Sequence, residues 1–176
     1  ACDVTDLSPL AELRGIRILG IFANPVSDLR PLRGMSTIEW LSMENSKVSD
    51  LSPLAYLPRL QKLYSHGCKE LTDISPLMKI PTLENLTVPR TARNIEILKD
   101  HPGLRILDFQ GETGDRSFPV TTPEMFWKRW EEQRWRRLLD ESGIAYSASA
   151  DQEGNWKVAI SSREFRDCSI FKGAPI

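Results

Sequence analysis

Apolar and polar positions repeat along the first 110 residues with a period of 22 or 23 residues. Each period contains a short stretch in which apolar and polar residues alternate, followed by a seven-residue turn. The turn is written four times, as VTDLSPL from Val4, VSDLRPL from Val26, VSDLSPL from Val48 and LTDISPL from Leu71. Alternation over a few residues indicates a strand, so the pattern predicts one strand and one turn in each repeat.

The alternating stretches place one leucine of each repeat at the centre of a predicted strand. We expect five short parallel strands, centred on Leu19, Leu41, Leu63, Leu86 and Leu107. Successive side chains of a strand point to opposite faces, so one set should enter the core and the other should line a concave surface. A period of this length is typical of a leucine-rich-repeat solenoid.

The turn predicts a short helix on the convex side of each repeat. In three of the four turns a serine precedes proline, which favours a helix capped by the serine hydroxyl, at Ser8, Ser52 and Ser75. These helices should be short and 3₁₀ in character, beginning at Pro9, Pro31, Pro53 and Pro76. An aspartate just before each helix can bond backbone amides of the turn: Asp6, Asp28, Asp50 and Asp73. Arg30 replaces the serine in the second turn, which should therefore be the weakest-capped.

The D-L-S-P-L turn, with strands 22 residues apart, resembles the internalin-like class of bacterial leucine-rich repeats. It is also similar to long multi-domain bacterial proteins built from such units, some of which carry a serine/threonine kinase domain. The resemblance covers residues 3 to 110. It implies an α/β fold, a right-handed βα superhelix with short parallel strands and 3₁₀ or short helical convex turns.

After Leu77 the turn phrase lapses and longer helical patterns appear. Residues 94–100 predict a longer helical segment on the convex side. Thr122, Pro123 and Glu124 favour a helix start, and the helix should run to about Ser142. Its wide apolar arc indicates packing on two sides, and in the resembled class such a helix closes a block of repeats.

The last part of the chain predicts a small β segment. Residues 144–148 and 156–160 alternate around a turn at 151–155. We therefore expect three parts: a solenoid over 1–110, a loop and capping helix over 111–143, and a hairpin-like segment over 144–176. Residues 166–176 look like a degenerate repeat turn, so the alternative is that Trp156–Ile160 begins a second repeat block.

Composition and charge narrow the function only a little. The chain is 40% hydrophobic and 27% charged, with a net charge of −1, which gives no overall attraction to nucleic acid or an anionic membrane. No apolar run is long enough to span a bilayer. Three cysteines and two histidines without metal-type spacing predict neither a metal site nor a cofactor.

The cysteines and the chain ends also bear on compartment and context. Unpaired thiols and the absence of a basic-then-apolar leader favour the cytoplasm, with a secreted or cell-surface location as the alternative. The chain opens inside a repeat without a polar cap, so we expect it to be a piece of a longer polypeptide.

The predicted concave face is the candidate site. It combines aromatic and charged side chains, and we expect partner contacts at Phe22, Trp40, Glu44, Lys62, Tyr64, His66 and Arg90. Exposed aromatic residues anchor protein interfaces because they bury a large area at low entropic cost. The alternative is that residues after Gly111 fold over these aromatic side chains.

Three other patterns are weaker candidates for chemistry. His66 with Tyr64, Glu44 and Asp108 could be drawn as an acid–base group, but no nucleophile lies at a sharp turn beside it. Cys68 occupies the repeat position where Asn or Cys bonds a neighbouring loop, which predicts a structural role. The helix over 123–142 interleaves tryptophan and basic residues, but its acidic residues offset the charge, and a solvated face is the simpler interpretation.

These patterns predict a protein–protein interaction module, not an enzyme, whose concave face binds another protein. Nucleic acid is not the expected partner. One alternative is the non-catalytic recognition part of a larger signalling enzyme such as a kinase. Another is a structural or assembly subunit that joins its partners through the open ends of the repeat stack.

Overall fold

The computed structural model describes residues 3–109, 121–141, 146–150 and 156–160. The chain divides into two compact units, Ala1–Pro123 and Glu124–Ile176. The first unit holds the repeats, and each unit is described by itself below.

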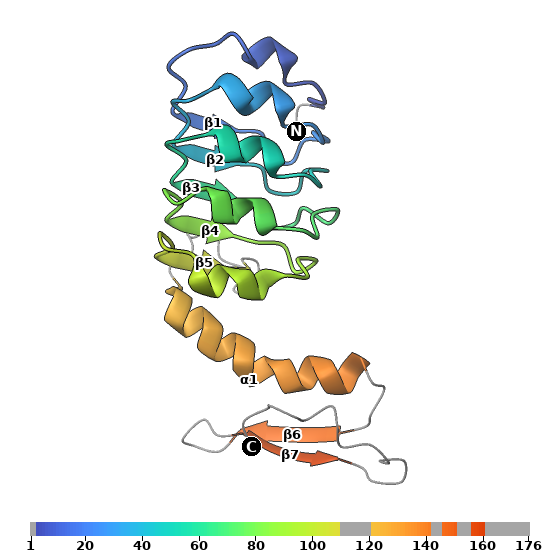
Figure 1. Cartoon of the computed structure of the whole chain (residues 1–176). Coiled ribbons are helices and arrows are strands. Elements are labelled where there is room, and N and C mark those ends of the chain that lie inside the picture. Colours follow the sequence, from blue (N-terminus) through green and yellow to red (C-terminus); the bar gives the residue numbers. More distant parts are fainter. Residues whose placement is uncertain (1–2, 110–120, 142–145, 151–155, 161–176) are drawn as a thin grey trace. The chain divides into compact units, whose positions relative to one another are not determined.

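A five-stranded parallel sheet forms one side of the first unit (Figure 1). Its strands follow chain order: β1 (Ile18–Gly20), β2 (Trp40–Ser42), β3 (Lys62–Tyr64), β4 (Asn85–Thr87) and β5 (Ile106–Asp108). The register pairs Leu19 with Leu41, and continues through Leu63, Leu86 and Leu107. The predicted strands and their parallel order are therefore confirmed.

Short 3₁₀ helices form a second column beside the strands (Figure 1). They are η1 (Ser8–Leu10), η2 (Arg30–Gly34), η3 (Ser52–Tyr56), η4 (Ser75–Lys79) and η5 (Ile95–Asp100). The core of the unit lies between the two columns, because the central leucines of β2–β5 and of η2–η4 are fully buried. Each repeat therefore buries its apolar side chains against the repeats on either side of it.

The helices begin one residue earlier than expected, and serine does not cap them. Ser8, Ser52 and Ser75 are themselves the first helical residues, and the preceding residue makes no side-chain capping bond. The cap comes from the aspartates instead. Asp50 Oδ1 accepts a hydrogen bond from Ser52 N–H at 2.8 Å, and Asp6 and Asp73 do the same for Ser8 and Ser75. The aspartate side chain reaches the amide two residues ahead, so it satisfies the N–H of the first helical residue, whereas a serine cap would have accepted from an N–H two or three residues further on.

The second turn is not the weakest-capped, contrary to expectation. Asp28 Oδ1 accepts from Arg30 N–H at 2.9 Å, as in the other turns. The Arg30 guanidinium adds bonds to both carboxylate oxygens of Asp28, at 2.8 and 3.0 Å. Because the cap is made by the aspartate, replacing the serine leaves it intact.

Cys68 has the structural role that its repeat position predicts. Its side chain is fully buried, and its Sγ donates to Met43 O at 3.1 Å in the preceding repeat. Ser46 Oγ lies 3.3 Å from the same sulfur. Burial raises the pKa of the Cys68 thiol, so the group stays protonated and acts as a hydrogen-bond donor inside the core.

The second unit contains the helix α1 (Pro123–Glu141) and the strands β6 (Tyr146–Ala150) and β7 (Trp156–Ile160). The bounds of α1 agree with the predicted helix to within a residue. Phe126 stacks at 6.2 Å on Trp130 and meets Trp127 edge-on at 5.0 Å. None of the helices in the described ranges is long and apolar enough to cross a membrane.

The two strands of the second unit pair antiparallel, unlike the parallel strands of the repeats. The degenerate turn expected over 166–176 lies outside the described residues. The capping role of α1, the division into three parts and the second repeat block stay predictions.

Candidate functional site: the concave face of the sheet

The sheet face opposite the buried leucines is the predicted concave face. The strand register arranges its side chains in two columns, one through Ile18, Trp40, Lys62, Asn85 and Ile106, the other through Gly20, Ser42, Tyr64, Thr87 and Asp108. Adjacent members of a column lie about 4.8 Å apart, the spacing of neighbouring strands. Residues 22 apart in the sequence are thus direct neighbours on this face.

Trp40 lies near the middle of the face, in contact with two side chains of the next repeat. The Tyr64 ring meets the Trp40 ring edge-on, with centroids 5.6 Å apart and an interplanar angle of 71°. Lys62 Nζ lies 5.4 Å from the centroid of the Trp40 ring, at the distance of a cation–π contact. We call Trp40, Lys62 and Tyr64 the Trp40 cluster.

The members of the Trp40 cluster differ in exposure. Trp40 and Lys62 are half-buried, whereas Tyr64 is only 5% exposed. Burial raises the pKa of Tyr64, and a side-chain hydrogen bond with Asn85 opposes this rise. The expectation that Tyr64 is an exposed aromatic is therefore wrong. Its ring packs edge-on against Trp40 of β2, and its hydroxyl forms a hydrogen bond with Asn85 of β4.

His66 and Glu44 lie at the next position along the strands, and both are half-buried. His66 Nδ1 is 3.2 Å from Thr87 Oγ1, which also accepts a hydrogen bond from Ser65 N–H at 3.1 Å. Burial lowers the pKa of His66, against the opposing charge of Glu44. The imidazole is therefore mainly neutral at pH 7, and the Thr87 hydroxyl can donate to Nδ1. Glu44 accepts a hydrogen bond from the Ser42 hydroxyl.

Phe22 and Arg90 lie near opposite ends of the face. Phe22 belongs to the repeat of β1 and is 59% exposed. The Arg90 guanidinium lies 5.4 Å from the centroid of the Phe109 ring, beyond β4. Three strand spacings, about 14 Å, separate the β1 and β4 positions. The structure thus separates Phe22 from Arg90. Phe22 lies one strand from Glu44, because Ile21 and Ala23 N–H donate to Ser42 O and Glu44 O.

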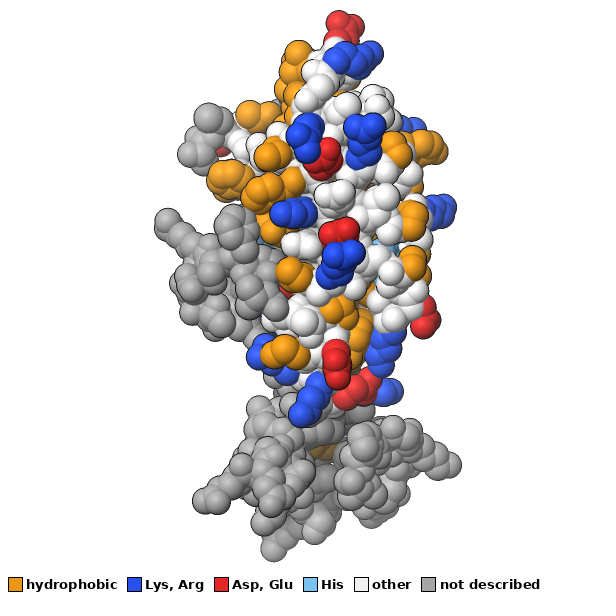
Figure 2. Space-filling model, turned by 90° about the vertical axis from the view of Figure 1, so that its left-hand side faces the viewer, with side chains coloured by type: hydrophobic (Ala, Val, Ile, Leu, Met, Phe, Trp, Pro, Cys, Tyr) orange, Lys and Arg blue, Asp and Glu red, His pale blue; other side chains and the backbone are white. Residues whose placement is uncertain are grey.

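Charges of both signs alternate along the sheet. Arg17 binds Glu39 through two parallel hydrogen bonds of 2.7 and 2.9 Å, and Arg105 approaches Glu84 at 4.0 Å. Figure 2 shows one face of the molecule on which single basic and acidic side chains alternate with apolar ones. Neither sign forms a continuous block on the face drawn. A polyanion such as nucleic acid would need such a block of positive charge.

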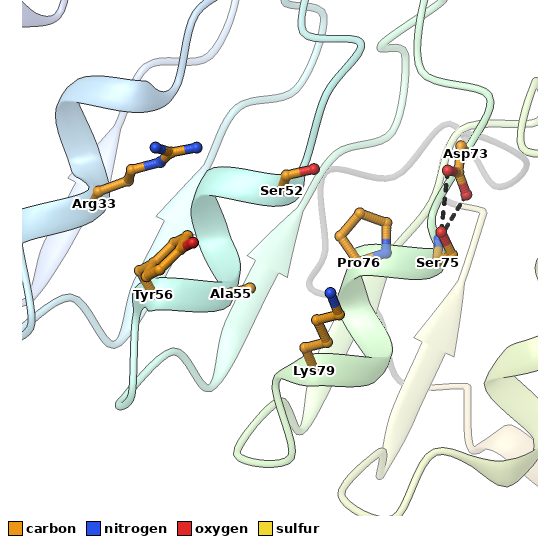
Figure 3. Close-up of a pocket in the computed structure, with 8 residues that line it drawn as sticks. All are labelled: Arg33, Ser52, Ala55, Tyr56, Asp73, Ser75, Pro76 and Lys79. Atoms are coloured by element: carbon orange, nitrogen blue, oxygen red, sulfur yellow. Dashed lines mark hydrogen bonds between the residues drawn. The ribbon is translucent and has the colours of Figure 1, made fainter.

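The convex side carries a groove that sequence reasoning missed. It has a volume of about 580 Å³ and runs beside η3 and η4 (Figure 3), lined by Arg33, Ser52, Ala55, Tyr56, Asp73, Ser75, Pro76 and Lys79. The Arg33 guanidinium lies 5.1 Å from the centroid of the Tyr56 ring. Tyr56 and Lys79 are each the last residue of their 3₁₀ helix. This shared position in successive repeats is the signal from which the sequence could have predicted the groove. Its lining carries both signs of charge and favours no single class of ligand.

Within the described ranges, no three His, Cys, Asp or Glu side chains converge so as to hold a metal ion.

The parallel sheet, the 22-residue period and the 3₁₀ turns define a leucine-rich-repeat solenoid. Solenoids of this class present an extended surface that binds other proteins. The fold class expected from the turn phrase is thereby confirmed.

Among solved structures, the chain is similar to two internalins of Listeria monocytogenes. Internalin C2 is 30% identical with a TM-score of 0.51, over 60% of this chain and 46% of the internalin chain, and this similarity confirms the internalin-like resemblance. Internalin F is 23% identical with a TM-score of 0.45, over 60% of this chain and 38% of that one. This chain therefore matches less than half the length of either internalin. No protein-family model matches the chain, and no curated protein matches it.

Proposed function

We propose that the solenoid is a protein-interaction module that binds a partner protein on its concave face, with Trp40 as the central contact. The supporting observation is the Trp40 cluster. Lys62 and Tyr64, both from the next repeat, hold the half-exposed indole in one orientation. A tryptophan held in place before binding loses little conformational entropy when a partner covers it.

The residues around Trp40 suit the rim of such an interface. Lys62 lies against the indole, and Glu44 and His66 lie at the next position along the strands. All three are half-buried polar side chains that can exchange hydrogen bonds with polar groups of a partner. Interfaces commonly surround a buried aromatic anchor with polar residues of this kind. Phe22 and Arg90 extend the proposed interface toward its two ends.

We propose no catalytic role for this face. In the described part of the chain, His66 shares a hydrogen bond with the Thr87 hydroxyl and lies in the field of Glu44. The kinase-linked hypothesis and the cytoplasmic location stay predictions. The similarity to internalin C2 covers less than half of that protein, so it supports a protein-binding class and names no partner.

Replacement of Trp40 tests the proposal. Cross-linking through Lys62, followed by mass spectrometry, identifies the partner, and titration with the purified partner then gives Kd. We expect Trp40→Ala to weaken binding by about 2 kcal/mol or more, which is about 30-fold in Kd. The matched control is Ile106→Ala, which lies three strands away in the same column and should change Kd by less than about threefold.

Urea unfolding of each variant separates binding from folding. The Kd of Trp40→Ala is informative only if this variant still unfolds in urea in one cooperative transition. Equal affinity of the wild type and Trp40→Ala, together with weaker binding by Tyr56→Ala on the convex groove, would place the interface on the other side of the solenoid.

A further inference from the structure

We infer that His66 is a fixed hydrogen-bond donor on the concave face, and that His66 and Glu44 together recognise an amide group of the partner protein. The inference rests on the proposed function, since it concerns the same face of the sheet. It adds the chemical class of one partner group, and it assigns Thr87 as the residue that positions the His66 ring.

The Thr87 hydroxyl determines which ring nitrogen of His66 carries the proton. Thr87 is 0% exposed, so its side chain is shielded from solvent. Its Oγ1 accepts from Ser65 N–H at 3.1 Å and lies 3.2 Å from His66 Nδ1. Among the described residues, Nδ1 is the only acceptor within hydrogen-bond distance of this hydroxyl. A buried hydroxyl without an acceptor is costly, so Thr87 donates to Nδ1.

The neutral His66 ring then carries its proton on Nε2. A neutral imidazole has one N–H and one lone pair, and Nδ1 uses the lone pair for the bond with Thr87. Burial lowers the pKa of His66, and a hydrogen bond donated to Nδ1 favours the neutral ring as well. In the described part of the chain Nε2 makes no hydrogen bond and is not enclosed, so its N–H is accessible to another molecule.

Glu44 supplies an acceptor beside this donor. The register that pairs Ser42 with Tyr64 continues two residues further, where Asn45 N–H donates to His66 O at 3.1 Å. Glu44 is therefore the neighbour of His66 across the ladder, about 4.8 Å away, the spacing of adjacent strands. One of its carboxylate oxygens accepts from the Ser42 hydroxyl, and the other accepts no hydrogen bond within the described ranges.

A neutral amide fits this pair of a donor and an acceptor. Its carbonyl oxygen can accept from His66 Nε2–H while its N–H donates to the Glu44 carboxylate. A partner carboxylate would lie beside the charge of Glu44 and be repelled, and a partner ammonium would leave the His66 N–H without an acceptor. The main chain and the side chains of Asn and Gln are the two sources of such a group.

NMR of the full, nitrogen-labelled chain tests the assignment of His66 without a partner. Long-range proton–nitrogen correlations distinguish the Nε2–H ring from the Nδ1–H ring. The chain has two histidines, and the spectrum of His66→Gln identifies which signals belong to His66. We expect the Nε2–H form to dominate at pH 7.

Replacement of Thr87 tests its positioning role by the same measurement. Thr87→Val removes the hydroxyl, so it should raise the pKa of His66 and give a mixture of the two ring forms, whereas Thr87→Ser should keep the wild-type pattern. The matched control is Thr82→Val, which removes a hydroxyl that donates to Leu60 O at 2.9 Å and not to His66. This control should leave the His66 signals unchanged.

Two replacements of His66 test the recognition of an amide. The amide nitrogen of glutamine can take the place of Nε2, whereas the amide oxygen of asparagine can take only the place of Nδ1. In titrations with the partner protein purified for the Trp40 experiment, His66→Gln should change Kd by less than about twofold, and His66→Asn should weaken binding at least about fivefold. In the partner, the Asn and Gln residues nearest the Lys62 cross-link are then replaced by alanine. Loss of binding identifies a side-chain amide, and retained binding a main-chain one.

The outcomes for His66 and for the whole face can be told apart. A dominant Nδ1–H form at pH 7, or a pKa of His66 that is unchanged in Thr87→Val, would overturn the donor assignment. Equal affinities of His66→Gln and His66→Asn would overturn the recognition of an amide, and weaker binding by Trp40→Ala in the same titrations would still support the concave face as the binding site. Wild-type affinity of Trp40→Ala would overturn the proposed function and the amide partner with it, but not the donor assignment.

Discussion

At the scale of single residues, the turn aspartates make the stability of the repeats depend on pH. Hydrogen bonds from the Ser52 hydroxyl and the Ser52 N–H lower the pKa of Asp50 below its ordinary value of 3.8. A carboxyl whose pKa is lower in the folded state stabilises that state above pH 3.8. The stabilisation is lost as the pH falls through the folded-state pKa.

Asp50→Ala and Asp50→Asn separate the cap from its charge. We expect Asp50→Ala to lower the free energy of unfolding by about 1 kcal/mol near pH 7, the usual effect of losing a helix cap. Asp50→Asn keeps an acceptor oxygen, so it should cost less and should remove part of the loss of stability below pH 3.8. Urea unfolding across the acid range measures both effects. A wild-type acid dependence that persists unchanged in Asp50→Asn would show that this carboxyl is not its source.

Residue identity alone did not reveal one backbone feature of the repeats. Ala23, Asn45 and Gly67 share a left-handed conformation at one point of successive repeats, with φ of 53°, 56° and 72°. A Cβ at Gly67 would lie 2.2 Å from Asn45 Oδ1, so any other residue there would have to displace the Asn45 side chain. Alanine at the first of these positions hid the pattern, because alanine does not favour a left-handed turn as asparagine and glycine do.

At the scale of elements, the repeat was predictable because its signals are local. The leucine spacing places the strands, and the D-L-S-P-L phrase places the 3₁₀ helices, within a residue of where they lie. The capping atom was mispredicted because serine and aspartate both occur in the phrase and both can bond backbone amides. Which one does so depends on where the helix begins, and that is one residue before the proline.

The position of a repeat in the stack should set the cost of a core substitution. We expect Leu63→Ala, at a 0% exposed site, to lower the free energy of unfolding by about 2–5 kcal/mol. Leu19→Ala removes the same atoms from a half-buried site and should cost less than about half as much. Urea unfolding compares the two. Equal costs would mean that Leu19 is packed as tightly in solution as Leu63.

At the scale of the whole molecule, the chain forms two units, and the first holds all five strands of the parallel sheet. Its core is built from contacts between neighbouring repeats. We expect a truncated chain of residues 1–123 to fold, with a urea midpoint within about 0.5 M of the first unit's transition in the full chain. Loss of cooperative unfolding on truncation would show that the second unit contributes to the stability of the first.

The sequence by itself determined the repeat, its period, its parallel strands and the face that each side chain occupies. These follow from short-range patterns, and each repeat needs only a neighbour like itself to bury its leucines. Only the tertiary structure decided which side chains of the concave face are exposed. Trp40 is half-exposed and Tyr64 buried because the neighbours that cover each ring come from repeats 22 or 23 residues away.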